Sequence, residues 1–99
     1  MSYSVRIRYA AEQDVIEAQR WYEQQQRGLA ARFHEEFAAT IKVLADTPLI
    51  YPEMYRNVRR TVVHRFPYLI WYREDDSIIT ILACTHGRAS PARAGRRVR

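Results

Sequence analysis

The residues of this chain that could do chemistry are mostly basic, and they lie at two places in the sequence. Arg59, Arg60, His64 and Arg65 lie on or next to one predicted strand, and His86 and Arg88 lie at the end of another. An arginine and a histidine across one face of a sheet could bind a scissile phosphate and move a proton, as RNA cleavage by a 2′-hydroxyl group requires. Equally, a histidine near a strand end is often a surface residue with no catalytic task, so the residue types alone leave both interpretations open.

The sequence lacks the motifs of several other kinds of site. It contains no GxGxxG or GxxxxGK[ST] segment, so no phosphate-binding loop is predicted. The three histidines and Cys84 lack the paired spacing of a zinc site, and we expect neither a metal nor a cofactor. Cys84 could in principle act as a nucleophile, yet a lone strand cysteine usually behaves as a small hydrophobic residue.

The cysteine count and the hydropathy pattern bear on where the protein works. A single cysteine cannot form an intramolecular disulfide, which fits a reducing compartment. No stretch approaches the roughly 20 apolar residues of a membrane span, and the start MSYSVRIRYA lacks the apolar core of a signal peptide. We therefore expect a cytoplasmic protein that does not contact a membrane.

Charge is distributed unevenly along the chain. Residues 1–53 hold six Arg or Lys against eight Asp or Glu, and residues 54–99 hold ten against three, so the two halves carry −2 and +7. Fifteen of the sixteen cations are arginine, whose planar guanidinium group suits forked binding of phosphate or carboxylate. Many small domains are basic without binding nucleic acid, but this clustering favours a surface for a polyanion or an acidic partner.

The pattern of apolar residues predicts a single α+β domain with the element order β-α-α-β-β-β. The predicted elements are a strand at Tyr3–Tyr9, helices at 11–26 and 29–44, and strands near 57–65, 67–74 and 77–86. Phe33, Phe37 and Ile41 form one apolar stripe of the second helix, and we expect all three to meet the sheet. The expected architecture is a helical hairpin packed on one face of a small antiparallel sheet. Residues 1–93 are assigned to this domain, and residues 94–99 to a basic, mobile tail.

Two helices can cover only one face of such a sheet, so the other face bears on binding. Leu69, Ile70 and Trp71 are consecutive in one predicted strand, so at least one large apolar side chain points away from the helices. Loops and the tail could shield it, but an exposed apolar surface also indicates a protein partner, which is the interpretation we favour.

Five short motifs occur along the chain in a fixed order. They are D-x-x-E-A-x-x-W-Y at residues 14–22, R-F at 32–33, V-R-R at 58–60, R-F-P-Y-x-I-x-Y at 65–72 and H-G-R at 86–88. Together they resemble the RelE/ParE superfamily of bacterial toxins over about residues 3–93, and the fourth motif followed by a strand ending in H-G-R is the most specific part. The resemblance implies a toxin of a type II toxin–antitoxin module, which a cognate antitoxin neutralises by forming a hetero-oligomer with it.

Within this superfamily, the resemblance implies one of two activities. RelE-like members cut messenger RNA on the ribosome, whereas ParE-like members lack that active site and inhibit DNA gyrase. The segment HGRASPARAGRR contains no tyrosine where RelE-like toxins place one, and the helical hairpin with Trp21-Tyr22 is closer to ParE. We therefore predict a ParE-like gyrase inhibitor. The alternatives are a RelE-like messenger-RNA endonuclease, and a remnant that has lost toxicity and only binds its antitoxin.

The resemblance also assigns roles to residues. A nuclease would use Arg59, Arg65, His86 and Arg88, with His86 or Arg88 acting on the reacting phosphate. A surface for gyrase would consist of Arg60, Arg88, Arg93, Arg96 and Arg97. An amphipathic, net acidic segment of the antitoxin would be anchored on Trp21, Tyr22, Trp71 and Arg59, because aromatic and arginine side chains dominate such interfaces.

Overall fold

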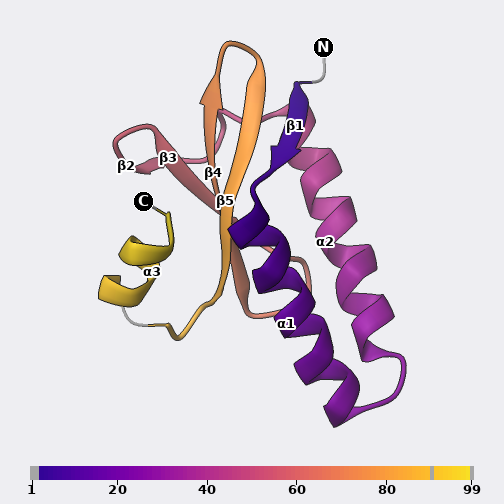
Figure 1. The fold of residues 1–99 in the computed structure, drawn as a ribbon. Coiled ribbons are helices and arrows are strands. Elements are labelled where there is room, and N and C mark those ends of the chain that lie inside the picture. The colour runs from indigo at the N-terminus through magenta and orange to yellow at the C-terminus, as the bar shows by residue number, and fades with distance from the viewer. Residues whose placement is uncertain (1–2, 90, 99) are drawn as a thin grey trace.

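The chain folds into a hairpin of two long helices packed on a five-stranded sheet, with a short third helix on the other side (Figure 1). The structure is a computed structural model that describes residues 3–89 and 91–98, the side chains of residues 91–93 and 98 excepted. The helices are α1 (Tyr9–Gln25), α2 (Leu29–Asp46) and α3 (Pro91–Val98), and the strands are β1 (Ser4–Ile7), β2 (Glu53–Tyr55), β3 (Val58–Val62), β4 (Tyr68–Asp75) and β5 (Ile78–His86). The predicted α+β class and the order of the six predicted elements are confirmed, and β2 and α3 are additional.

The sheet is mixed, whereas the sequence led us to expect an antiparallel one. The strand order is β1-β5-β4-β3-β2, and β1 pairs in parallel with β5 in the register of Ser4 with Ile78. The other neighbouring strands are antiparallel. The hairpin carries the chain from one edge of the sheet to the other, so the last strand returns beside the first and runs in the same direction. Alternation of apolar residues shows which face of a strand is buried and not which strand lies next to it, so the pattern could not predict this pairing.

Two predicted boundaries also differ from the structure. Helix α1 begins at Tyr9, which is 75% exposed, so Tyr9 does not continue the buried face of the predicted first strand. Helix α3 spans Pro91–Val98, so the predicted boundary between domain and tail at residue 93 falls inside a helix. Over residues 3–89 and 91–98, no helix has the length and apolar character needed to cross a membrane.

The hydrophobic core lies between the helical hairpin and the sheet. Phe33 and Phe37 of α2 are buried and Ile41 packs against the same cluster, so the predicted stripe does face the sheet. Tyr22 of α1 stacks on Phe33 with ring centroids 5.5 Å apart, and Phe66 packs edge-on against both rings. Because these rings fix α1 against the sheet, they also fix which α1 side chains face the end of β5.

Candidate functional site

Arg59 lies on the helix-covered face of the sheet, where it fastens a loop. It is opposite the fully buried Tyr72 of β4, and its Nη1 donates a hydrogen bond to the carbonyl oxygen of Tyr51. The Tyr72 hydroxyl donates a hydrogen bond to the carbonyl oxygen of Pro48 at 2.6 Å. Burial raises the pKa of Tyr72 to about 12; the positive charge of Arg59 lowers this pKa, and the nearby Tyr51 raises it further. The Arg59 guanidinium group is thus engaged by the chain itself, and its roles in catalysis and in antitoxin binding stay predictions.

Arg65 lies in the turn between β3 and β4 and pairs with α2. Its Nε lies 3.8 Å from Oε2 of Glu36, and Nδ1 of His64 lies 3.4 Å from the same oxygen. Neither Arg59 nor Arg65 lines the cleft at which His86 and Arg88 lie. The four residues predicted for a nuclease are therefore not brought together in one site.

The H-G-R turn at the end of β5 is held by short-range hydrogen bonds. The Gly87 N–H donates to the carbonyl oxygen of Pro67 at 2.7 Å, and a Cβ at residue 87 would lie 3.3 Å from that oxygen, so glycine permits the close approach. The Arg88 N–H donates to Nδ1 of His86 at 3.0 Å, so a neutral His86 ring carries its proton on Nε2. The ring also packs edge-on against Tyr68. The turn thus places an imidazole with one N–H donor and an exposed guanidinium group at one cleft, and His86 also lines a second groove.

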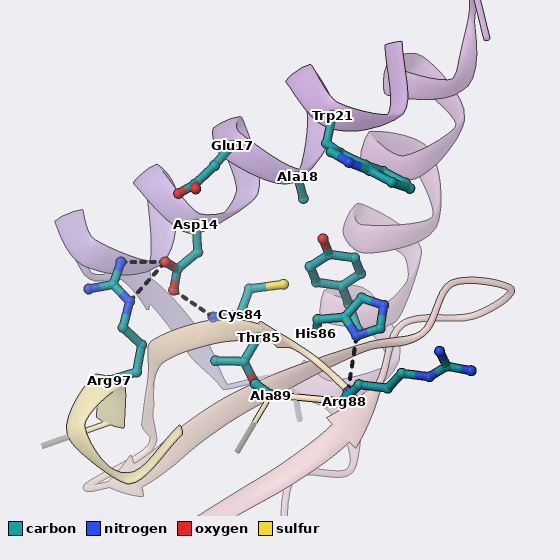
Figure 2. A pocket seen from close by; sticks show the side chains of 11 residues that line it. Asp14, Glu17, Ala18, Trp21, Cys84, Thr85, His86, Arg88, Ala89 and Arg97 are labelled. Carbon is teal, nitrogen blue, oxygen red and sulfur yellow. Dashed lines mark hydrogen bonds and ion pairs between the residues drawn. The ribbon is translucent and has the colours of Figure 1, made fainter. Parts of the chain in front are cut away.

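This cleft, of about 590 Å³, lies between α1 and the end of β5 (Figure 2). The α1 residues that line it are Asp14, Glu17, Ala18 and Trp21. The last three follow Asp14 by three, four and seven residues, so all four lie on one stripe of the helix. They are the residues of the D-x-x-E-A-x-x-W-Y motif other than Tyr22, which points into the core. We predicted a role for Trp21 and missed Asp14 and Glu17, although the helical spacing of the motif already indicates that these side chains share a face.

The cleft is hollow because small side chains form its floor. Ala18 of α1 and Cys84 of β5 are buried there. Burial, with the nearby Asp14 carboxylate, raises the pKa of the Cys84 thiol to about 12, so the thiol stays protonated and is a poor nucleophile. Burial is also the main cause that raises the pKa of Tyr68, and the negative charge of Glu17 across the cleft is among the smaller causes.

Asp14 ties three elements together at one end of the cleft. Its Oδ2 accepts a hydrogen bond from the Cys84 N–H at 3.0 Å, and its Oδ1 accepts from both Nε, at 3.0 Å, and Nη2 of Arg97 (Figure 2). Nη2 of Arg97 also donates to the carbonyl oxygen of Ala10 at 3.2 Å, and Arg8 donates to the carbonyl oxygen of Arg97 at 2.6 Å. Helix α3 is thereby fastened to α1 and β5. The Arg97 guanidinium group therefore has a structural role within the chain, and its role in target binding stays a prediction.

A second groove, of about 390 Å³, lies on the sheet face opposite the hairpin. Arg60 and Trp71 are neighbours across β3 and β4, and the guanidinium carbon lies 5.4 Å from the centroid of the indole ring. The indole N–H donates to Oγ1 of Thr85 at 2.8 Å. The apolar part of the lining includes Met54, Tyr55, Val58, Leu69 and Ala94. The uncovered apolar face predicted from β4 therefore exists, and α3 covers only part of it.

Exposure separates the remaining predicted binding residues. Trp21 is 53% exposed, and Arg88 and Arg96 are also exposed, so a partner can reach all three. Tyr22 is only 9% exposed and its ring is part of the core, so its predicted role as a surface anchor is corrected to a role in packing. The side chain of Arg93 lies outside the described residues.

The cleft at the H-G-R turn offers several groups suited to recognising a partner. Its reachable groups are the Glu17 carboxylate, the Trp21 indole, the His86 imidazole and the Arg88 guanidinium. They can donate and accept hydrogen bonds, stack on a flat group and pair with charges of either sign. Within residues 3–89 and 91–98, no three His, Cys, Asp or Glu side chains are grouped so that they could hold a metal ion.

Three solved structures of toxins or toxin–antitoxin systems share this architecture. The chain resembles a protein of the chromosomal ParDE system from P. aeruginosa with a TM-score of 0.76, at 18% identity over 86% of this chain and 96% of that one. It also resembles a chain of the toxin–antitoxin complex RelBE2 from Mycobacterium tuberculosis, with a TM-score of 0.57 at 24% identity over 87% and 99% of the two chains. A mutant of the E. coli toxin RelE in the free state gives a TM-score of 0.69 at 11% identity over the whole of both chains. At these identities the likeness shows a shared fold.

Sequence comparison narrows this class to one family. Toxin ParE2 of Mycobacterium tuberculosis is 27% identical over 92 residues, which are 92% of this chain and 88% of that protein. The family model described as the ParE toxin of the type II toxin–antitoxin system parDE matches residues 5–91. The chain therefore belongs to the ParE family of toxins from type II toxin–antitoxin systems, which confirms the predicted superfamily. The matched segment includes the cleft residues of α1 and the H-G-R turn.

Proposed function

We propose that this protein stops growth by binding DNA gyrase and blocking supercoiling in the cytoplasm. The observation that carries the proposal is the separation of the residues that a nuclease would use. Arg59 fastens the loop before β2 and Arg65 lies beside Glu36 of α2, so neither lines the cleft at the turn that carries His86. Cleavage of RNA by a 2′-hydroxyl group needs charge stabilisation and proton transfer at one phosphate, which groups held apart cannot supply together.

The relatives and the charge distribution support the same target. The matched relative is named Toxin ParE2 and a structural neighbour comes from a ParDE system. Gyrase is the target that the resemblance to ParE-like toxins implies. Arg88 and Arg96 are exposed near the C-terminal end, in the half of the chain that carries the excess of positive charge. Such a surface attracts an acidic region of a partner and speeds encounter with it.

We further propose that a cognate antitoxin neutralises the toxin by covering the second groove, as part of a hetero-oligomer. Trp71 and Arg60 line it, an aromatic residue and an arginine of the kind that dominate binding energies at interfaces. The structural neighbours from the ParDE and RelBE2 systems support a partner of this class.

The test of the target is a pair of assays run side by side with the purified toxin. One follows supercoiling of a relaxed plasmid by gyrase, and the other follows cleavage of messenger RNA on ribosomes. We expect supercoiling to fall at toxin concentrations comparable to that of gyrase, while the messenger RNA stays intact. Arg88→Ala and Arg96→Ala should each weaken inhibition severalfold, because each supplies only part of an electrostatic surface.

The matched control is Arg32→Ala, which removes an exposed arginine from α2 and should leave inhibition unchanged. Cleavage of messenger RNA that His86→Ala abolishes, together with normal supercoiling, would contradict the proposal and assign the protein to the ribonuclease class.

A further inference from the structure

The cleft between α1 and the H-G-R turn holds a carboxylate that the fold does not use. Glu17 is exposed on the cleft wall, and within the described part of the chain no hydrogen bond or ion pair engages it. Asp14, on the preceding turn of the same stripe, already accepts bonds from Arg97 and from the Cys84 N–H. In a chain with a net charge of +5, a carboxylate left available in a cleft suits a cationic group far better than an anionic one.

Trp21 adds a flat aromatic surface next to that carboxylate. It follows Glu17 by four residues, so the two side chains are neighbours on the helix surface. It packs edge-on against Tyr22 and is 53% exposed, and Figure 2 shows its indole above His86. A guanidinium group is the cation that matches both features, because it stacks on an aromatic face and forms a forked pair with a carboxylate.

The opposite rim of the cleft limits what can carry that guanidinium group. Arg88 is exposed there and the side chain of Arg97 is 41% exposed, so an isolated cation would be repelled on approach. An arginine flanked by acidic residues avoids this cost, because a neighbouring carboxylate can pair with Arg88 while the guanidinium group reaches Glu17. The cleft volume of about 590 Å³ is large enough for an arginine side chain and part of the backbone that carries it.

We propose that this cleft is a docking pocket for a single arginine side chain in an acidic segment of a polypeptide partner. The guanidinium group stacks on Trp21 and donates to Glu17, and an acidic neighbour pairs with Arg88. The inference rests on the proposed antitoxin partner and deepens it, because it adds a charge of the opposite sign to the acidic contacts expected of that protein. It also places this contact on α1, which does not line the second groove, although the two hollows share Thr85, His86 and Ala89.

The direct test is a titration of the full ¹⁵N-labelled chain with short peptides, followed by NMR. The probe is acetyl-Asp-Arg-Glu-amide, and its comparison peptides carry lysine or glutamine in place of arginine. We expect saturable shifts of the amides of Ala18, Thr85 and Arg88, with a dissociation constant on the order of 1 mM for so small a ligand. The lysine peptide should bind at least threefold more weakly, and the glutamine peptide should not saturate.

Variants then assign the contact to the two α1 residues. Glu17→Gln should weaken binding of the arginine peptide at least threefold, and Glu17→Arg should abolish saturation. Trp21→Ala should also weaken it at least threefold, whereas Trp21→Phe should keep most of the affinity because it keeps an aromatic face. Glu35→Gln makes the same charge change on an exposed residue of α2 and should have no effect. Circular dichroism on each variant confirms that the fold is intact.

Three outcomes would overturn the proposal. The first is the absence of saturable shifts in the parent chain, and the second is equal affinity in the parent and in Glu17→Gln. The third is tighter binding of guanosine 5′-monophosphate at the same amides, which would make the cleft a nucleotide site. The titration contains neither gyrase nor antitoxin, so a negative result with normal antitoxin binding removes this pocket alone. Saturable peptide binding in a chain that no antitoxin binds removes the antitoxin proposal alone.

Discussion

Replacing Asp14 with asparagine should loosen the attachment of α3 to the rest of the fold. The side chain of Asp14 is 8% exposed and accepts three hydrogen bonds, one from the Cys84 N–H and two from Arg97. Asparagine has nearly the same shape but only one oxygen, and it turns an amide N–H₂ toward a group that is itself a donor. The variant therefore keeps the packing, removes the charge and loses the bonds to one of the two partners.

The expected cost follows from what each partner can regain from water. Hydrogen bonds to a charged group contribute about 1.5–3 kcal/mol, and breaking a fully buried ion pair costs about 3–5 kcal/mol. The Arg97 side chain is 41% exposed, so it recovers hydration and the higher range does not apply. We expect Asp14→Asn to lower the free energy of unfolding by about 2 kcal/mol. For a chain of 99 residues this is a large share of a total on the order of 5–15 kcal/mol.

The assay is urea unfolding followed by circular dichroism, with the parent and the variants at the same pH and salt concentration. Glu12→Gln, an exposed acid on the same helix, is the control and should change stability by less than about 0.5 kcal/mol. The double variant of Asp14→Asn with Arg97→Gln should cost at least about 1 kcal/mol less than the sum of the single variants, because the two residues share one interaction. A loss below about 0.5 kcal/mol for Asp14→Asn, or strict additivity, would refute the attachment described for α3.

Three further predictions concern the core, the loop before β2 and the second groove. Phe37→Ala should destabilise the fold by about 3–5 kcal/mol in urea unfolding, because Phe37 is 6% exposed and faces the sheet; a loss under about 1 kcal/mol would mean that its side chain is not held in the core. Tyr72→Phe should cost about 1 kcal/mol at neutral pH, since the hydroxyl no longer donates to Pro48. Folding raises the pKa of Tyr72 from 10.0 to about 12, so its contribution to stability is complete below pH 10.0 and is lost as the pH rises toward 12. Across this range the free energy of unfolding should fall less steeply with pH for Tyr72→Phe than for the parent. An equal slope in both proteins would exclude Tyr72 as the cause of the fall. Trp71→Ala should weaken antitoxin binding by about 2 kcal/mol, roughly 30-fold in titration calorimetry, and unchanged affinity in both this variant and Trp21→Ala with an intact fold would exclude both as anchors.

The helical part of the fold was predictable because its signals are local. The stripe of Phe33, Phe37 and Ile41 repeats with the period of a helix, and a helix with such a stripe has to bury it. The same reasoning applies to the α1 stripe of Asp14, Glu17 and Trp21, whose shared face can be derived from spacing alone. A sequence therefore shows which side chains of one helix act together.

The partners of those side chains were not predictable, because they depend on contacts between distant segments. Asp14 and Arg97 are 83 residues apart, and no pattern in either segment points to the other. Arg59 and Arg60 are adjacent polar residues in one strand, so alternation did not show which of them faces the helices, and the structure places Arg59 there. A shift of one residue exchanges the two faces of a strand. The sequence therefore did not show that Arg59, one of the residues predicted for a nuclease, lies on the covered face and fastens a loop.

The central claim, that the toxin acts on gyrase, is tested most directly inside growing cells. A plasmid is isolated from cells shortly after the toxin is induced, its topoisomers are separated on a chloroquine gel, and messenger RNA from the same cells is mapped for cleavage on ribosomes. We predict loss of negative supercoiling with intact messenger RNA, and a smaller loss with the double variant of Arg88→Ala and Arg96→Ala. Unchanged topoisomers in cells that stop growing and cut their messenger RNA would contradict the account.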